Sequence, residues 1–300
     1  MRTTSAWLCI TRFVGVAALA CAATAVAPAL TPSAFAAKAG GPEAFYLSLG
    51  DSMAFGMQFD RLFEMLDAGT YTPDAFDTGY SDVLAEHMQS LRPGQQMVNL
   101  SCPGESTDTM INGGCSFTRP EPDGPGLALH TSYDGSQLGA AVSFLQSHAG
   151  EVSPITVSVG GVDAAEVIAG QCNFVTACIE ESGLRDSLGA GLDRILSDLR
   201  AAAPNAEIVL VTFYNPFSVD VPGSDRLWRR YYSDVQHDAA RRHNDIRVAD
   251  IWHLFRGSHL CERTFLCDSG DFHPNDDGYR RIGDRVFRVA GYRPVLVRKN

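Results

Sequence analysis

Several features that mark common protein classes are missing from this sequence of 300 residues. No apolar segment reaches the ~20 residues that a membrane-spanning helix needs, because the apolar stretch Phe13–Ala27 is broken off by Pro28. There is no phosphate-binding loop, dinucleotide fingerprint or His-rich metal motif. There is also no Cys-x-x-Cys pair or Cys/His knuckle of the kind that holds zinc. We therefore expect no stable membrane insertion, no cofactor and no metal.

The N-terminal segment has the features of a secretory signal peptide. Arg2 and Arg12 precede the apolar stretch, and Ala34-Phe-Ala36 matches the small-residue cleavage signal. We expect residues 1–36 to be removed, leaving a secreted chain of 264 residues (300 − 36). Cys21 follows Ala18-Leu-Ala20, a poor match to a lipid-attachment site, so a lipid anchor at Cys21 is the minor alternative.

Positive charge is also scarce. Removal of the signal takes away two arginines and no acids, which leaves 22 basic residues (24 − 2) against 35 acidic ones and a formal charge of −13. An acidic surface argues against nucleic acid or an anionic membrane as a general partner. The charge also serves solubility and indicates nothing about catalysis.

The cysteines of the mature chain fall into pairs that are close in sequence. Each pair would close a loop of roughly 7 to 14 residues and stabilise the fold by about 2–3 kcal/mol if unstrained. Six cysteines allow 15 connectivities, but this clustering in an exported chain favours pairing between neighbours. The pairs are Cys102 with Cys115, Cys172 with Cys178, and Cys261 with Cys267.

Apolar runs and helical patterns alternate along the chain. Continuous apolar runs are typical of buried parallel strands, and helices between such strands indicate a three-layer α/β/α sandwich around a central parallel sheet. We expect one domain, residues 37–300, without repeats or linkers. The predicted strands are Phe45–Leu49, Ile155–Val159, Ile208–Phe213 and Ile246–Ala249, and the clearest helical patterns run from Leu184 to Leu199 and from Tyr279 to Val289. The Pro-, Gly- and Asp-rich stretch Phe117–Ser136 is predicted to be a long loop.

The most informative motif follows the first predicted strand, where Gly50-Asp51-Ser52 places a serine on a tight turn. Ligands of α/β sheets bind at this end of the strands. Two further segments, Asn99–Glu105 and Asp271–Tyr279, stand downstream in matching order. Together the three blocks resemble the SGNH/GDSL family of serine esterases and lipases, in particular its secreted actinobacterial members. In the α/β-hydrolases, by contrast, the nucleophile lies mid-chain on G-x-S-x-G.

The resemblance implies that Ser52 is the nucleophile and that His273, fixed by Pro274 and the helix start after it, is the base. A serine hydroxyl needs such a base and donors for the oxyanion. The resemblance assigns two donors to the amides of Ser52 and Gly104.

The third family donor is an asparagine in a Gly-x-Asn-Asp block, and here Gly160-Gly-Val-Asp163 puts Val162 at that position. Loss of one oxyanion donor typically lowers turnover by roughly 10²–10³. Asn112 and Asn215 are polar loop residues that could replace it, although both could equally be turn residues.

The group that orients His273 remains open. The family often has an aspartate three residues before the histidine, where this chain has Gly270. On an extended segment Asp271 would point the same way as the ring, the Gly270 carbonyl is a close rival, and Asp268 also flanks the motif. Asp271 could instead cap the following helix. The aspartates around His273 lack the spacing of a calcium loop.

An apolar cluster follows the nucleophile and either lines a groove for an acyl chain or belongs to the core: Met53, Phe55, Met57, Phe59, Leu62 and Phe63. The resemblance implies ester substrates that range from lipids to acylated glycans, cleaved through an acyl-serine intermediate by a monomer. Two alternatives remain, a weakened SGNH domain that binds glycan or lipid, and an acyltransferase.

Overall fold

The computed structural model of the chain describes residues 43–118 and 126–293. The predicted signal peptide and Cys21 lie outside the described residues, as does part of the predicted loop Phe117–Ser136. The described residues all belong to one compact unit. Within the described ranges, no helix combines the length and the apolar character needed to cross a membrane.

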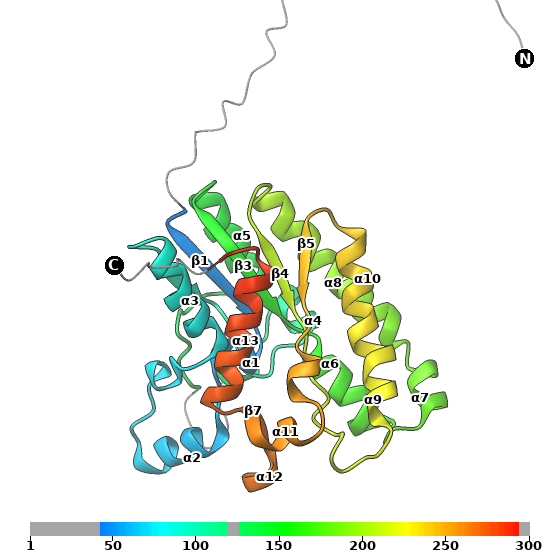
Figure 1. The fold of residues 1–300 in the computed structure, drawn as a ribbon. Helices are drawn as coiled ribbons and strands as arrows, with labels where there is room; N and C mark the ends of the chain where they lie inside the picture. The colour runs from blue at the N-terminus through cyan, green and yellow to red at the C-terminus, as the bar shows by residue number, and fades with distance from the viewer. Residues whose placement is uncertain (1–42, 119–125, 294–300) are drawn as a thin grey trace, which may run out of the picture. The chain divides into compact units, whose positions relative to one another are not determined.

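Five parallel strands form the central sheet in the order β2-β1-β3-β4-β5 (Figure 1). The strands are β1 (Phe45–Gly50), β2 (Gln96–Asn99), β3 (Val152–Ser158), β4 (Ile208–Val211) and β5 (Ile246–Ala249). The four predicted strands match β1, β3, β4 and β5. The edge strand β2 was not predicted, because its four residues are mostly half-exposed and lack a continuous apolar run.

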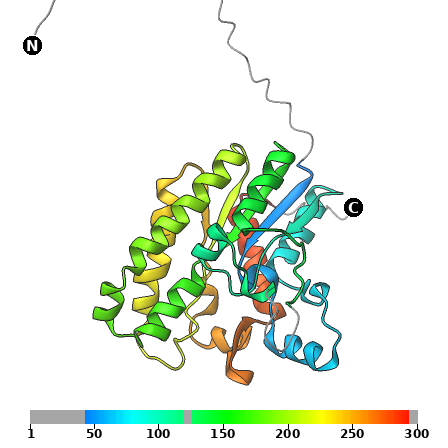
Figure 2. The same cartoon turned by 180° about the vertical axis from the view of Figure 1, so that it is seen from behind.

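Helices cover both faces of the sheet, as Figures 1 and 2 show from opposite sides. Helices α3 (Tyr80–Leu91) and α13 (Asp276–Val289) pack together on one face. On the other face α8 (Leu184–Ala202) lies between α5 (Gln137–Ser147) and α10 (Asp234–Arg242). The predicted α/β/α sandwich with a parallel sheet is therefore confirmed.

Shorter elements lie between these layers and around the ends of the strands. The short α-helices are α1 (Ser52–Phe55), α2 (Phe59–Ala68), α4 (Thr107–Asn112), α6 (Gly161–Ala165), α7 (Thr176–Glu181), α9 (Ser224–Trp228), α11 (Ser258–Arg263) and α12 (Leu266–Ser269). Three 3-10 turns span Pro73–Phe76, Ser116–Thr118 and Trp252–Phe255, and two π-helical segments span Glu166–Gln171 and Arg229–Ser233. Strands β6 (Thr264–Phe265) and β7 (Asp271–Pro274) form an antiparallel pair.

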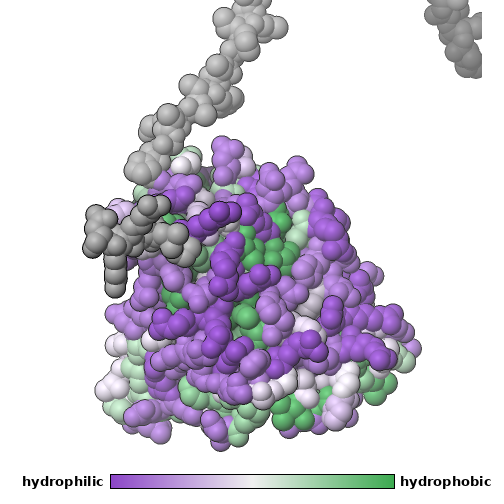
Figure 3. Space-filling model, in the orientation of Figure 1, coloured by the Kyte–Doolittle hydropathy of each residue, from purple (hydrophilic) through white to green (hydrophobic). Residues whose placement is uncertain are grey.

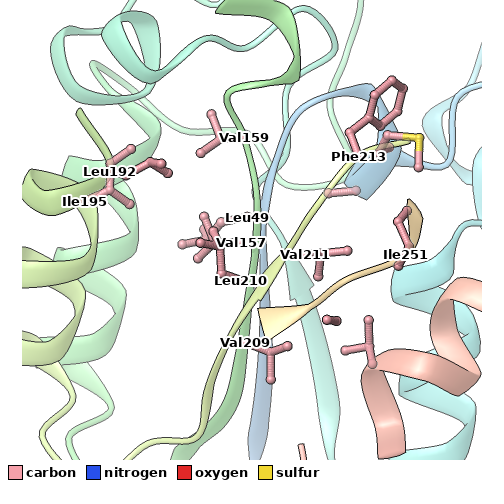
Figure 4. Packing of buried hydrophobic residues seen from close by; sticks show 14 of the residues in the cluster. Leu49, Val157, Val159, Leu192, Ile195, Val209, Leu210, Val211, Phe213 and Ile251 are labelled. Carbon is pink, nitrogen blue, oxygen red and sulfur yellow. The ribbon is translucent and has the colours of Figure 1, made fainter. Parts of the chain in front are cut away.

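The core explains why the strands read as continuous apolar runs. Successive side chains of β4 point to opposite faces, so that Leu210 faces α8 whereas Val209 and Val211 face the α13 side (Figure 4). All three are fully buried. Because both faces are covered, every position of such a strand is apolar. Truncation of one of these side chains to alanine is expected to cost about 2–5 kcal/mol.

All three predicted cysteine pairs are close enough to form disulfides. The Cα–Cα distances are 6.1 Å for Cys102 and Cys115, 5.5 Å for Cys172 and Cys178, and 5.3 Å for Cys261 and Cys267. Disulfides normally span Cα–Cα distances of about 4.4–6.8 Å. Each therefore closes a local loop, as the clustering indicated.

The face drawn in Figure 3 is mainly hydrophilic, with apolar residues visible near its centre and along its lower edge. Among the described residues, the exposed large apolar side chains include Phe63 and Leu66 on α2. These two side chains lie on the helix that follows the nucleophile.

Candidate active site

The nucleophile turn requires glycine at its first position. Gly50 ends β1 with φ +139°, and a Cβ there would collide with the carbonyl of Ser158 on β3. The Gln137 side chain holds the turn, since its Oε1 accepts from Gly50 N–H at 2.6 Å and its Nε2 donates to the Gly50 carbonyl at 3.0 Å. Asp51 then caps α1, accepting from Met53 N–H at 2.9 Å. Ser52 is thereby placed at the start of a short buried helix.

Helix α1 is held by side chains from several distant parts of the chain. The Ser52 carbonyl accepts from the N–H groups of Gly56 and Met57, and side chains satisfy later carbonyls at the end of this short helix. Ser81 and Asn99 donate to the Ala54 carbonyl, His130 donates to the Phe55 carbonyl, and Tyr279 donates to the Met57 carbonyl just after the helix. Several distant segments therefore anchor the backbone that carries Ser52.

Ser52, His273 and Asp271 form a hydrogen-bonded series. The Ser52 Oγ lies 2.9 Å from His273 Nε2, and His273 Nδ1 lies 2.6 Å from Asp271 Oδ1. His273 and Asp271 are 1% and 3% exposed, whereas Ser52 is partly exposed. Two segments that are 221 residues apart in the sequence thus meet at one point. A nucleophile, a base and an orienting carboxylate have this geometry.

Asp271 is the group that meets His273 Nδ1, a partner that the sequence did not settle. Its Oδ1 also accepts from the His273 N–H at 2.9 Å, and its Oδ2 accepts from Phe59 N–H at 2.7 Å. Burial alone would raise the pKa of this carboxyl, but the hydrogen bonds and charge of His273, with the Phe59 amide, hold the pKa below its ordinary value. The carboxylate stays ionised and can orient the imidazole ring.

The rival groups lie elsewhere. His273 Nδ1 meets the Asp271 carboxylate rather than the Gly270 carbonyl, and Asp268 is exposed on α12. Helix α13 is capped by Asn275, which accepts from Gly278 N–H at 3.0 Å. Asn275, and not Asp271, is therefore the cap of this helix.

Two backbone amides belong to residues that line the pocket beside Ser52 Oγ. These residues are Ser52 and Gly104. Among the described residues, neither amide donates to an acceptor in the protein. Gly104 has φ +82°, a left-handed conformation that glycine adopts without strain. Both groups are free to donate to an oxygen bound beside Ser52.

The candidate replacements for the missing asparagine do not reach this pocket. Val162 lines it, with its side chain partly exposed. Asn215 is 2% exposed, and its amide group donates to Ser224 and Asp225. Asn112 is exposed and donates to Asp108 on α4. The idea that either asparagine replaces the family donor is therefore corrected, because both amides are engaged in local structure.

The pocket beside Ser52 is mainly apolar and has a volume of about 220 Å³. Of the apolar cluster predicted after the nucleophile, Met53 and Phe59 line it, whereas Phe55, Met57 and Leu62 are buried and Phe63 is exposed. Other apolar residues of its wall were not predicted from the sequence, and they include Ala165, Phe213, Pro216, Phe217 and Phe272. Three of these follow β4, and their place at the carboxyl end of a parallel strand was the available signal.

A second pocket of about 650 Å³ lies on the other side of Val162 and Gly104. Its lining is more polar and includes Thr107, Asp108 and Asp163. Asp163 accepts from the Thr107 amide at 3.0 Å, which ties α6, the helix that carries Val162, to the start of α4. Val162 therefore forms part of a wall between an apolar and a polar space.

The fold and the site together define a class, a three-layer α/β/α hydrolase with a serine, a histidine and an aspartate at the carboxyl edge of its sheet. The chain matches the GDSL-like lipase/acylhydrolase family over residues 48–281 and belongs to it. Membership of this family supports ester hydrolysis as the general activity.

Individual relatives are distant. The chain is 26% identical over 136 residues to the uncharacterized protein YpmR of Bacillus subtilis (strain 168), a match that spans 44% of this chain and 51% of that protein. Among solved structures, it is similar to the lipase Lip_vut3 from a goat rumen metagenome (TM-score 0.53, 18% identity, 83% of this chain and 97% of that one). It is also similar to the extracellular lipase of Streptomyces rimosus (TM-score 0.51, 18% identity, 81% and 99%). At these identities the likeness shows the fold.

Proposed function

We propose that this protein is a secreted serine esterase or lipase that cleaves carboxylic esters through an acyl-serine intermediate. The observation that carries the proposal is the series Ser52–His273–Asp271, with contacts of 2.9 Å and 2.6 Å. A serine and a histidine that hydrogen-bond only to each other could be a polar pair without a catalytic role. Here the serine faces a pocket and the imidazole has an ionised partner behind it, as nucleophilic catalysis requires.

In the first half of the reaction, Ser52 Oγ attacks the ester carbonyl carbon and His273 Nε2 takes the serine proton. The carbonyl oxygen becomes an oxyanion and accepts from the amides of Ser52 and Gly104. Asp271 holds the charged imidazole ring. The tetrahedral intermediate then breaks its bond to the alcohol oxygen, which leaves with the proton from His273.

In the second half, water replaces the alcohol. His273 takes a proton from the water as its oxygen attacks the acyl-serine carbon, and the same two amides bind the second oxyanion. Collapse breaks the bond to Ser52 Oγ, which recovers its proton from His273. The products are the acid, the alcohol and unchanged enzyme.

Of the two halves of the ester, the acyl group is the better fit to the apolar pocket. Phe213, Phe217 and Val162 offer it no hydrogen-bond donors from their side chains. The wall therefore favours an apolar acyl chain, whereas the alcohol leaves on the side of His273. Three predicted disulfides and the likeness to an extracellular lipase support an extracellular location.

One observation favours a second function. Val162 removes a side-chain oxyanion donor of the family, which suits a weakened domain that binds lipid or glycan esters without rapid turnover. An acyltransferase would use the same groups with a sugar hydroxyl in place of water.

The test is hydrolysis of p-nitrophenyl acetate, butyrate and palmitate by the purified protein and by Ser52→Ala. We expect hydrolysis by the native protein, loss of nearly all of it in Ser52→Ala without a change in melting temperature, and labelling of Ser52 by an organophosphonate. Native rates in Ser52→Ala would reject Ser52 as the nucleophile. Absence of both hydrolysis and labelling would favour the binding function.

A further inference from the structure

A cluster of metal-ligating side chains lies away from the catalytic residues, on the far side of α1. One nitrogen or oxygen atom from each of Asp74, Asp77 and His130 lies within 4.8 Å of the others. Asp74 lies in the 3-10 turn before α3, and Asp77 directly follows that turn. His130 comes from the loop before α5. Three residues from two separate segments therefore converge on one small space.

His130 is the informative member of the cluster. Its side chain is only 8% exposed, and its ring packs on Phe55 with 4.3 Å between ring centroids. Its Nε2 lies 2.9 Å from the Phe55 carbonyl oxygen. A carbonyl only accepts, so Nε2 carries a proton and donates it to Phe55. The other ring nitrogen, Nδ1, faces the carboxylate of Asp77 and is the atom that would bind a metal ion in exchange for a proton.

The distance from His130 Nδ1 to Asp77 Oδ1 is 3.3 Å. Direct charge-assisted N–H···O contacts are shorter, about 2.7–2.9 Å, and the pair His87–Asp284 in this protein has 2.7 Å. Two ligands of a tetrahedral zinc ion, each ~2.0–2.1 Å from the metal, lie roughly 3.3–3.4 Å apart. The separation fits two ligands of one ion, and it equally fits an ion pair, since His237 Nε2 lies 3.3 Å from Asp250 Oδ2. The convergence of Asp74 as a third ligand favours the ion.

The surroundings support the same assignment. Among the described residues, His130 is the only ion-pair partner of Asp77, and Asp74 has none. The neighbouring Arg61 guanidinium donates to the Ala75 carbonyl at 2.7 Å and to Thr78 rather than to either carboxylate. A histidine that binds a metal usually donates its other N–H to a backbone carbonyl or a carboxylate, and the contact to Phe55 has that form.

We propose that Asp74, Asp77 and His130 form a site for a divalent ion of the zinc type, with a fourth position open to water. Imidazole favours zinc and its neighbours, whereas calcium takes six to eight oxygen ligands. The ion joins the turn before α3 to the loop before α5 and, through His130, to the carbonyl of Phe55 in the helix that begins with Ser52. The site is structural, since none of its residues lines the pocket beside Ser52.

The test compares the chelator-treated full chain with and without Zn²⁺. We expect Zn²⁺ to raise the melting temperature by several degrees, because an ion that binds only the folded state stabilises it by mass action. Asp74→Asn and Asp77→Asn keep the side-chain volume and should each lose most of this shift. Asp284→Asn is the matched control, because it removes the carboxylate from an exposed His–Asp pair, and it should keep the full shift.

Calorimetric titration supplies a second readout. The native protein should bind one equivalent of Zn²⁺ more tightly than Asp74→Asn does, which keeps the test decisive if Asp77→Asn fails to fold. No thermal shift in the native protein, or an equal shift in Asp74→Asn, would overturn the proposal and leave a plain ion pair between His130 and Asp77. A larger shift with Ca²⁺ than with Zn²⁺ would overturn the zinc-type assignment.

Discussion

The two sides of Ser52 differ in how they are built. On the base side, the side chains of Ser52, His273 and Asp271 are joined in series, His273 and Asp271 are almost fully buried, and the backbone N–H of Phe59 binds the second carboxylate oxygen. On the proposed oxyanion side, the candidate donors are the backbone amides of Ser52 and Gly104, and Val162 occupies the place of a family side chain.

The difference follows from what each side has to do, because proton transfer and stabilisation of an oxyanion place different demands on the protein. Proton transfer requires a specific side chain at a specific atom, so we expect changes on the base side to be costly. An oxyanion can be held by several kinds of donor, so we expect the other side to tolerate a change of side chain as long as backbone donors remain.

The largest effect is expected on the base side. His273→Ala should lower kcat about as far as Ser52→Ala, by up to ~10⁶-fold, because a nucleophile and its base act as one unit. For the same reason the double variant should be hardly slower than either single variant. Steady-state kinetics on p-nitrophenyl butyrate measures all three. Additive losses would show that the two residues work independently.

Asp271→Asn should have the next largest effect. An amide can present an N–H to His273 Nδ1 and favour the wrong tautomer, which lowers kcat by up to ~10⁴-fold in a serine–histidine–aspartate unit. Asp268→Asn is the matched control, since Asp268 is exposed on the neighbouring helix α12. It should leave the rate unchanged. Equal losses in the two variants would mean that Asp271 does not orient the ring.

Val162→Asn tests the oxyanion side. If only two backbone donors serve the oxyanion, the new amide should raise kcat on a short-chain ester by up to ~10². Part of the gain can be lost where the amide is left without a partner. Val162→Ala is the control, because it opens the same space without a donor. A well-folded Val162→Asn that is no faster than Val162→Ala would mean that another group already completes the oxyanion site.

The smallest effect concerns stability beside the nucleophile. Burial raises the pKa of Asp51 from 3.8 to about 7, opposed by the Met53 amide, and the charge of Asp163 raises it further. The folded protein therefore holds this proton more tightly than the unfolded chain does, and stability falls as the pH rises from about 4 towards 7. Asp51→Asn keeps an oxygen to cap Met53 N–H and has no proton to lose.

The melting temperature of Asp51→Asn should therefore rise relative to the native protein between pH 4 and pH 8. Asp60→Asn, at an exposed position on α2, is the control and should show no such trend. Thermal denaturation at four or five pH values measures both. A difference between Asp51→Asn and the native protein that stays constant with pH would contradict the raised pKa.

Short-range patterns in the sequence were enough to predict the layers of the fold and to select Ser52 and His273 as candidate site residues. Continuous apolar runs predicted four of the five strands, because burial on both faces leaves a local signal. The edge strand β2 lacks that signal, since its residues are partly exposed. Ser52, His273 and the neighbouring cysteine pairs stand in motifs whose geometry is set within a few residues.

Only the tertiary structure decided which groups meet across long separations. Asp271 rather than the Gly270 carbonyl or Asp268 faces His273, because β7 is extended and Phe59 N–H, 212 residues away, binds the other carboxylate oxygen. Asn215 is excluded as an oxyanion donor only by its contacts with Ser224 and Asp225. The sequence determined the residue types and their local backbone, whereas long-range packing determined their partners, because a side chain's contacts depend on neighbours that no local pattern encodes.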